Sequence, residues 1–333
     1  MLDVITIGTA TRDVFLQSKQ FKTLTDSARL RKLGFKTGAA ECVPLGSKVE
    51  VENAVYAIGG GAANAAVTFA RMGMRTAALV KVGDDEIGND IETVLQREKV
   101  NLIKRASPGQ SAYSTILIAP SGERTVLVFR GVSDDWSEKD VAGIPQARWA
   151  YLAPGAMPLP VLWKTVRNLK RSGTKIAMNP SRAHLSGNAK ALAPILKLLD
   201  AVFVNREEAS LLTGVPFSDT HGMFRKFDAL VPGCAVMTDG AKGAFASDGK
   251  TLYRVGIFKN TRVVDRTGAG DAFGSGFIAG LSIGKDVPEA LRIGSANATS
   301  VVETIGAQKG ILSKTGLREK RWQGLAVRKE KLR

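Results

Sequence analysis

The stretch DRTGAGDAFGSGFIAGL, residues 265–281, decides the fold more than any other part of the sequence. Two glycines in the turn let the backbone approach a ligand closely, and the apolar residues that follow have helical spacing. A strand-like run, TRVV at residues 261–264, precedes the turn. A helix that begins here would point unpaired backbone N–H groups and the positive end of its dipole outward, which favours a bound anion.

Asp271 lies at the predicted start of this helix, beside the expected anion hole. Such a pair suits transfer of a phosphoryl group to an alcohol, because the N–H groups stabilise developing charge while the carboxylate takes the hydroxyl proton. A lone Gly-x-Gly-Asp sequence would more often be a glycine-rich turn in which the aspartate caps the helix. The choice between these two interpretations therefore depends on the rest of the chain.

Residues 265–271 resemble the signature of the ribokinase (PfkB) family of carbohydrate kinases, which usually reads Asp-Thr-x-Gly-Ala-Gly-Asp. The chain carries Arg266 where the family often has Thr, and it matches at the other fixed positions. Further family motifs occur in family order, so the resemblance covers roughly residues 3–312. The resemblance implies a catalytic set of Asp271 as general base and an anion hole of Gly268, Ala269 and Gly270.

The sequence GGGAANAA, residues 59–66, resembles the family's first signature, Gly-Gly-x-Gly-x-Asn-x-Ala, with Ala62 at a position that is often Gly. The run VITIG at residues 4–8 is typical of a buried parallel strand, and Asp13 follows just beyond it, where ligands of open α/β sheets gather. Taken alone, Asp13 would be a turn residue, and residues 59–66 would serve tight helix–sheet packing. The resemblance implies that four residues bind sugar hydroxyls: Asp13, Gly60, Gly61 and Asn64.

Two further motifs stand at the ends of predicted strands. NREE at residues 205–208 matches the family's Asn-x-x-Glu, and TDGAKG at residues 238–243 resembles its Thr-x-Gly-x-x-Gly. Taken alone, the first is an ordinary helix start and the second a β-turn. The resemblance implies that Glu208 holds Mg²⁺ through water, which suits an ion that keeps several waters. It also implies an ATP-binding set of Asn205, Thr238, Gly240, Gly243 and Asn297.

A monovalent cation is the remaining cofactor that the resemblance implies, since IGA at residues 305–307 resembles a family sequence near K⁺. The implied ligands are the Asp265 carboxylate and the main-chain carbonyls of Thr267, Val301, Thr304, Gly306 and Gly310. Carboxylates in GDDEIG, residues 83–88, could also bind a metal, but a turn and a helix N-cap are the preferred interpretation.

Short apolar runs alternate with helical patterns from residue 148 to 256, which predicts a parallel sheet covered on both faces. Runs at 113–119 and 124–129 alternate and are joined by PSGE, a hairpin signal. Strands near residue 14 and at 48–52 also fall outside the main rhythm. The resemblance implies a ribokinase-like three-layer α/β/α fold, doubly wound around a mostly parallel sheet, with a small β-sheet lid that excludes water.

These patterns divide the chain into three parts. The expected α/β core comprises residues 1–11, 59–110 and 132–315, and it includes a helix over 184–199 that Pro194 interrupts. The expected lid, with a basic insertion that has loop or short helical character, comprises residues 12–58 and 111–131 and is a candidate homodimer interface. Residues 316–333 are expected to form a mobile, basic C-terminal tail.

Composition limits the remaining possibilities. With two cysteines and two histidines in 333 residues, the sequence argues against a disulfide framework, a histidine-built metal site and a Ser-His-Asp triad. Without a signal sequence or an apolar run of transmembrane length, we expect a cytoplasmic protein with no membrane partner. The net charge is +16, but the basic stretches of the sequence are not interleaved with aromatic residues. Attraction of anionic substrates is therefore favoured over nucleic-acid binding.

The predicted activity is ATP-dependent phosphorylation of a hydroxymethyl group on a sugar or sugar-like substrate. A nucleoside kinase of the same family is the main alternative. A non-catalytic member that binds sugar or nucleic acid is disfavoured by the intact Asp271 and its anion hole. Other glycine-loop functions fail on spacing, because no P-loop sequence is present and Phe273 stands where a dinucleotide fingerprint needs Gly.

Overall fold

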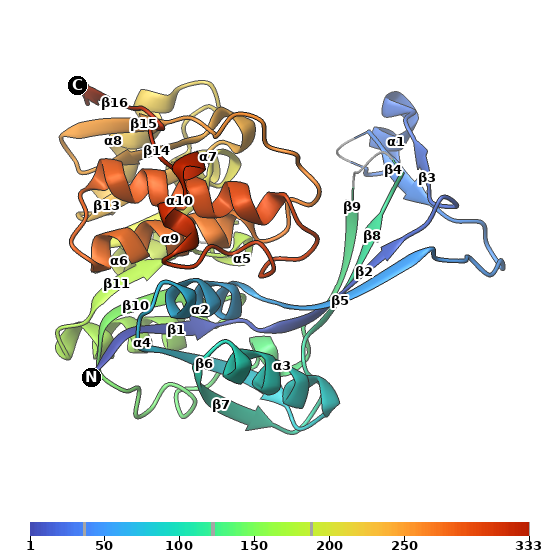
Figure 1. The fold of residues 1–333 in the computed structure, drawn as a ribbon, viewed down its shortest axis with the longest axis horizontal. Helices are drawn as coiled ribbons and strands as arrows, with labels where there is room; N and C mark the ends of the chain where they lie inside the picture. Colours follow the sequence, from blue (N-terminus) through green and yellow to red (C-terminus); the bar gives the residue numbers. More distant parts are fainter. Residues whose placement is uncertain (36–37, 121–123, 187–188, 333) are drawn as a thin grey trace.

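A ten-stranded sheet forms the centre of the computed structural model, which describes residues 1–35, 38–120, 124–186 and 189–332 (Figure 1). Seven neighbouring strands, from β7 to β13 in spatial order, are parallel, and the last three are antiparallel. In spatial order the strands are β7 (Asn101–Ser107), β6 (Thr76–Gly83), β1 (Leu2–Gly8), β10 (Ala147–Ala153), β11 (Lys175–Met178), β12 (Ala201–Asn205), β13 (Cys234–Thr238), β14 (Ala244–Ser247), β15 (Thr251–Val255) and β16 (Val327–Lys331).

Helices cover both faces of this sheet, because the buried strands are apolar on both sides and need partners on both. One apolar core lies under four helices: α2 (Gly61–Arg71), α3 (Glu86–Arg97), α9 (Ala269–Ser282) and α10 (Val287–Val302). A second core lies under five: α4 (Leu159–Arg171), α5 (Arg182–Leu185), α6 (Ala189–Leu196), α7 (Arg206–Thr213) and α8 (Thr220–Leu230). The predicted doubly wound α/β/α architecture is confirmed.

A separate four-stranded sheet projects from one side of the core (Figure 1). Its order is β5 (Asn53–Gly59), β2 (Thr11–Gln17), β8 (Tyr113–Ile118) and β9 (Arg124–Phe129). At its far end lie a two-stranded sheet of β3 (Lys22–Leu24) and β4 (Ala40–Cys42) and the short helix α1 (Ser27–Lys32). We call this whole projection the lid. The residues expected to close its hairpin, 121–123, lie outside the described part of the chain.

One lid strand lies later in the chain than predicted. Residues 48–52 are irregular, and the strand runs instead over β5, which pairs antiparallel with β2 from Thr11↔Gly59 to Gln17↔Asn53. The alternation of valine and glutamate at 48–52 misled the prediction, because pairing with β2 rather than local alternation fixes the register. The correct register leads β5 directly into the start of α2.

Three other expectations were wrong for identifiable reasons. Residues 261–264 do not form a strand, and Val263 is 53% exposed. The C-terminal segment is not a mobile appendage, because it supplies the edge strand β16 beside β15 and buries Trp322. The helix expected over 184–199 is two helices, α5 and α6, and Pro194 lies inside α6; residues 187–188 are outside the described part.

Strand β7 was missed because it carries little apolar signal. Its sequence, NLIKRAS, lies at the edge of the sheet and no residue in it is fully buried. Edge strands need an apolar pattern on one face at most, so periodicity detects them poorly. Among the described residues, none of the helices combines the length and apolarity needed to cross a bilayer.

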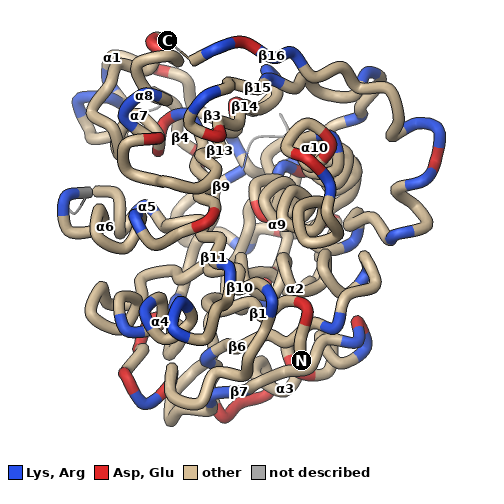
Figure 2. The backbone as a smooth tube through the Cα atoms, turned by 90° about the vertical axis from the view of Figure 1, so that its left-hand side faces the viewer, with Lys and Arg blue, Asp and Glu red and all other residues tan. Residues whose placement is uncertain are grey.

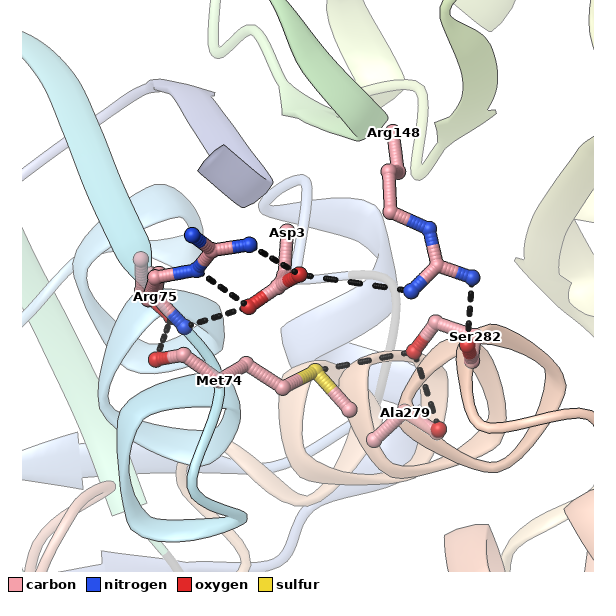
Figure 3. Close-up of polar contacts among 7 residues, drawn as sticks. Asp3, Met74, Arg75, Arg148, Ala279 and Ser282 are labelled. Carbon is pink, nitrogen blue, oxygen red and sulfur yellow. Dashed lines mark hydrogen bonds and ion pairs between the residues drawn. The ribbon is translucent and has the colours of Figure 1, made fainter. Parts of the chain in front are cut away.

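The amino edge of the sheet is held by paired charges (Figure 3). Asp3, in β1, accepts hydrogen bonds from the backbone N–H and guanidinium of Arg75 at 2.9 and 3.2 Å, and it lies 4.0 Å from Arg148. Arg148 in turn donates to the carbonyl of Ser282, the last residue of α9, whose hydroxyl contacts Met74 Sδ at 3.5 Å. This cluster fixes the C-terminal end of α9 against the starts of three strands.

Candidate active site

The opposite, carboxyl edge of the sheet brings Asp271 and Asn64 together. Asp271 lies in the first turn of α9, and Asn64 lies in the first turns of α2. Asn64 Nδ2 donates to Asp271 Oδ2 over 2.9 Å, and Gln308 Nε2 donates to Asn64 Oδ1 over 3.1 Å. Gln308, which the sequence analysis missed, thereby orients the Asn64 amide with its donor toward the carboxylate.

The turn before α9 has the geometry of an anion-binding site. Gly268 is the N-cap at φ 76°, in the left-handed region, and a side chain there would overlap Ala307. Among the described residues, no acceptor receives the N–H groups of Gly268, Gly270 or Asp271. The N–H of Ala269 instead donates to the carbonyl of Arg266 over 3.4 Å. The N–H of Asp271 itself is thus a further donor that the sequence analysis did not include.

Burial raises the pKa of the Asp271 carboxyl. The hydrogen bond from Asn64 opposes this shift, and the negative charge of Asp13 adds to it. A carboxylate with a raised pKa is a stronger base, which suits it to take a proton from a hydroxyl near neutral pH. The fully buried phenol of Tyr151 also feels the charge of Asp271, and burial holds the pKa of this phenol well above its usual value.

Gly61 lets the start of α2 lie close to Asp271. A Cβ atom at this position would lie 3.2 Å from Asp271 Oδ1 and 2.7 Å from Ala153 Cβ. Gly60 is the N-cap residue of the same helix, and the N–H of Gly61 donates to Thr9 Oγ1 over 3.0 Å. The small residues of this signature therefore place the helix start against the carboxylate and leave Oδ1 accessible.

Asp13 is not a turn residue but a member of lid strand β2. Its side chain is buried (6% exposed) and accepts a hydrogen bond from Thr11 Oγ1 over 2.9 Å. Burial raises the pKa of Asp13, the hydroxyls of Thr11 and Ser114 lower it, and the charge of Asp265 raises it. A buried carboxylate without a cationic partner lowers the stability of the fold, and further hydrogen-bond donors would stabilise it.

The two predicted nucleotide loops lie side by side at the ends of β12 and β13. Asn205 and Glu208 form a capping box, in which each side chain accepts from the other's backbone N–H at 2.9 and 2.8 Å. Burial raises the pKa of the Glu208 carboxyl. Thr238 ends β13, and the tight turn after it contains Gly240, which is exposed, and Gly243, which is buried. Each loop thus has a structural role and remains open to solvent.

An ion pair that the sequence analysis missed joins these loops. Arg206 Nε lies 2.9 Å from Asp239 Oδ2, and both side chains are nearly buried. The rings of Phe217 and Phe245 each lie 5.5 Å from the guanidinium carbon. Both charged residues lie within the motifs quoted from the sequence. Their ion pair could not be predicted, because it depends on the pairing of β12 with β13.

The structure does not support the expected contact of Asn297 with adenine. This side chain is 0% exposed, and its amide donates to Thr68 Oγ1 and to the carbonyl of Ala272. Its oxygen accepts from the N–H of Leu312 over 2.9 Å. With its polar atoms already engaged, Asn297 fixes α10 to α2, α9 and the C-terminal loop.

The residues predicted for K⁺ are only partly available. Asp265 accepts four hydrogen bonds, among them those from the backbone N–H groups of Thr267 and Gly306 at 2.9 and 3.0 Å. The carbonyl of Val301 accepts from the N–H and hydroxyl of Thr304 at 3.1 and 3.2 Å. Gly310 packs against the carbonyl of Ser300. In the described part of the chain, no group of three or more His, Cys, Asp or Glu side chains could hold a metal.

Comparison with known proteins gives a consistent result. The sequence profile described as pfkB family carbohydrate kinase matches residues 32–314. Ribokinase from Haemophilus influenzae is 30% identical over 276 residues, which cover 80% of this chain and 88% of that protein. Cytidine kinase from Thermococcus kodakarensis is 27% identical over 257 residues, covering 74% of this chain and 88% of that protein.

A solved structure shares the fold at lower identity. Ribokinase from Arabidopsis thaliana, complexed with ribose and ATP, superimposes with a TM-score of 0.78 at 20% identity. The match covers 97% of this chain and 99% of that one. At this identity the likeness concerns the fold alone.

Proposed function

This chain belongs to the pfkB family of carbohydrate kinases, and we propose that it transfers the γ-phosphoryl group of ATP to a hydroxymethyl group of a sugar or sugar-like substrate. Membership makes it a sugar or nucleoside kinase, a phosphotransferase with an alcohol acceptor. One observation carries the finer proposal: Asn64 holds Oδ2 of Asp271 and leaves Oδ1 accessible at the start of α9.

The acceptor hydroxyl would lie against Asp271 Oδ1. Its proton passes to this oxygen as the new O–P bond forms, and the bond from the γ-phosphorus to the bridging oxygen of ATP breaks. ADP leaves with that electron pair. The N–H groups at Gly268, Ala269 and Gly270, aided by that of Asp271, stabilise the negative charge on the transferred group. Since the N–H of Ala269 also contacts the Arg266 carbonyl, Gly268 and Gly270 are the stronger candidates.

We assign acceptor binding to Asp13, Gly60, Gly61 and Asn64. Asp13 lacks a cationic partner among the described residues and is coupled to Asp271 through their charges. Sugar hydroxyls supply the donors that such a buried carboxylate needs, and they would be held within reach of the base. A nucleoside acceptor presents the same hydroxyl groups on its ribose, so this geometry accommodates both classes.

We assign the ATP phosphates to the two loops joined by Arg206 and Asp239. These loops offer the side chains of Asn205 and Thr238 and the exposed backbone of Gly240, whereas the buried Gly243 shapes the turn through its backbone bonds to Asp239 and Gly240. Mg²⁺ would neutralise phosphate charge when bound. The donor set fits this ion, because Mg²⁺ keeps several waters and a single carboxylate, Glu208, suffices to hold one of them. The raised pKa of Glu208 reflects a buried carboxyl that gains from a nearby cation.

The lid offers a surface for a second copy of this chain. The edge strand β9 is exposed along its whole length, and Val126, Leu127, Val128 and Phe129 are all among its exposed residues. An exposed apolar edge strand invites pairing with another strand. We propose a homodimer through this edge, which light scattering of the purified protein would test: a monomer at tens of micromolar, roughly the concentration where specific interfaces persist, would refute it.

A non-catalytic, nucleic-acid-binding role has less support. Figure 2 shows Lys and Arg spread over many elements, with Asp and Glu among them, rather than gathered on one part of the backbone. Binding of nucleic acid would also not require Asp271 or the anion-binding turn before α9.

The test is a panel of sugars and nucleosides assayed for ATP-dependent ADP release. We expect at least one acceptor carrying a hydroxymethyl group to give turnover, with phosphate found on that group by NMR. No turnover with any acceptor, or ADP release equal with and without every acceptor, would contradict the proposal.

A further inference from the structure

An arginine of the lid reaches the turn that forms the anion hole. Arg124 begins β9, and its Nη1 donates to Asp265 Oδ1 over 2.8 Å, linking positions 141 residues apart. The Asp265 side chain is 3% exposed and that of Arg124 is 34% exposed. Because the carboxylate is buried, water and salt screen this charge-assisted hydrogen bond less than they screen a fully exposed pair.

Hydrogen-bond donors from the protein occupy both oxygens of Asp265, and Oδ1 has no capacity left for a metal ion. Oδ1 accepts from Arg124 Nη1 and from both the N–H and the hydroxyl of Thr267, at 2.8, 2.9 and 2.7 Å. Oδ2 accepts from the N–H of Gly306 over 3.0 Å. Each carboxylate oxygen offers about two lone-pair sites, so Oδ1, with three contacts of good length, is fully occupied, and Oδ2 already holds one donor.

A second expected ligand is occupied as well. The Val301 carbonyl accepts from Thr304 through both N–H and hydroxyl, and from the N–H of Glu303 at the end of α10. A cation would have to displace these donors, and at Asp265 it would also lie against a guanidinium of the same charge. These two of the six implied ligands therefore do not fit the K⁺ ion that the family resemblance implies.

We propose that the guanidinium of Arg124 takes the place of a monovalent cation at Asp265, so that the lid rather than K⁺ holds the anion-hole turn. The inference rests on the proposed kinase function. Arg124 is a positioning residue, because it acts through Asp265, whose Oδ1 in turn holds Thr267, the residue before Gly268. Arg124 also neutralises a carboxylate whose charge acts on Asp13.

The first measurement is the dependence of wild-type kcat on the cation. With the acceptor from the panel and constant Mg²⁺, kcat is compared in K⁺, Na⁺ and tetramethylammonium chlorides at equal ionic strength. We expect values within roughly twofold, because exposed charges are screened equally by the three salts. Activation by K⁺ of about tenfold or more, the size that a charge at the anion hole would have, overturns the inference.

Substitution of Arg124 gives the second test. In Arg124→Ala we expect kcat to fall roughly tenfold to a hundredfold, because the turn is displaced from its working position. Guanidinium chloride at millimolar concentration, or K⁺, should restore part of this loss, and Arg124→Lys should keep most of the activity. The matched control is Arg75→Ala, which removes an arginine from Asp3 at the opposite edge and should leave kcat unchanged. Full activity of Arg124→Ala contradicts the inference.

Thermal unfolding provides a readout that does not depend on activity. The Tm of the wild type should be the same in K⁺ and tetramethylammonium, whereas Arg124→Ala should gain stability specifically from K⁺. A K⁺-specific rise in the wild-type Tm overturns the assignment, since a ligand that binds only the folded state raises stability. If no acceptor is phosphorylated, the proposed function fails, but this comparison still decides whether Asp265 binds K⁺ or Arg124.

Discussion

The two edges of the main sheet treat carboxylates in opposite ways. At the amino edge, hydrogen bonds from Arg75, with the charges of Arg75 and Arg148, hold the pKa of Asp3 below its usual value (Figure 3). At the carboxyl edge, burial raises the pKa of Asp13 and Asp271, and neither has a cationic partner among the described residues. Aspartate is therefore stabilised as an anion at the amino edge. At the carboxyl edge, its burial favours binding of a proton or of a hydrogen-bond donor.

This difference distinguishes a carboxylate that stabilises the fold from carboxylates that serve substrate binding or catalysis. A folded chain has no structural reason to bury two neighbouring carboxylates without a cationic partner, since each costs stability. Groups of this kind cluster where a substrate supplies what the protein omits. The amino edge fixes the C-terminal end of α9, and the carboxyl edge uses the N-terminal end of the same helix.

The largest expected effect comes from Asp271→Asn. The amide keeps the shape of the carboxylate but cannot accept the hydroxyl proton, so kcat should fall roughly a hundredfold to ten-thousandfold. The affinity for ATP should stay nearly constant, because the assigned nucleotide loops lie on other elements. Steady-state kinetics and calorimetry with ATP measure the two quantities separately. A large loss of ATP affinity would mean that Asp271 serves nucleotide binding instead.

Asp13→Ala should have the next largest effect. Removal of this buried carboxylate leaves the acceptor's hydroxyls unpaired, at about 1–3 kcal/mol per group. We expect kcat/KM for the acceptor to fall roughly tenfold to a hundredfold, with KM for ATP little changed. The measurement varies each substrate in turn, with a circular dichroism spectrum as the folding control. The reverse pattern would place the two substrates the wrong way round.

The pH dependence of kcat sharpens the comparison further. The base must be deprotonated, so kcat falls as the pH drops through the pKa of Asp271. The Asn64 hydrogen bond lowers this pKa and the Asp13 charge raises it. Asn64→Ala should therefore move the acid limb of the profile to higher pH, and Asp13→Asn should move it to lower pH. Shifts in the same direction, or none, would show that another group controls the acid limb.

The smallest effect should come from Asp3→Asn. The pKa of Asp3 is lowered in the folded state, so its stabilisation is present above the unfolded pKa of about 3.9 and is lost as the pH falls through the folded pKa. Because Arg75 is 68% exposed, the pair should be weak, and the Tm at neutral pH should fall by roughly 2 °C or less. Calorimetry at neutral and acid pH tests this sign; a difference that grows in acid would contradict it.

Motif spacing predicted the carboxyl edge well, because its residues stand at the ends of strands and at helix starts. Asp271, Gly268 and Asn64 all lie where the sequence analysis expected them, and the α/β/α architecture is confirmed. The local sequence suffices for such features, since a turn followed by a helix is decided within a few residues.

Partnerships between distant residues could not be predicted in this way. Arg124 meets Asp265, Gln308 meets Asn64, and β16 meets β15 only after the chain has folded. Asn297 illustrates the same limit, because its place in the motif order suggested a contact with adenine but its amide is fully engaged in packing α10. A pattern gives the residue type and its place on an element, whereas the free hydrogen-bond capacity depends on the neighbours.

The most direct test compares one substitution at the two edges. Asp271→Asn and Asp3→Asn are mixed separately with ATP and the identified acceptor, and phosphoryl transfer is followed in a single turnover by rapid quench. We predict that Asp3→Asn transfers at the wild-type rate and that Asp271→Asn is slower by roughly a hundredfold or more. Transfer by Asp271→Asn at close to the wild-type rate, or an equal loss in both variants, would contradict the assignment of Asp271 as the base.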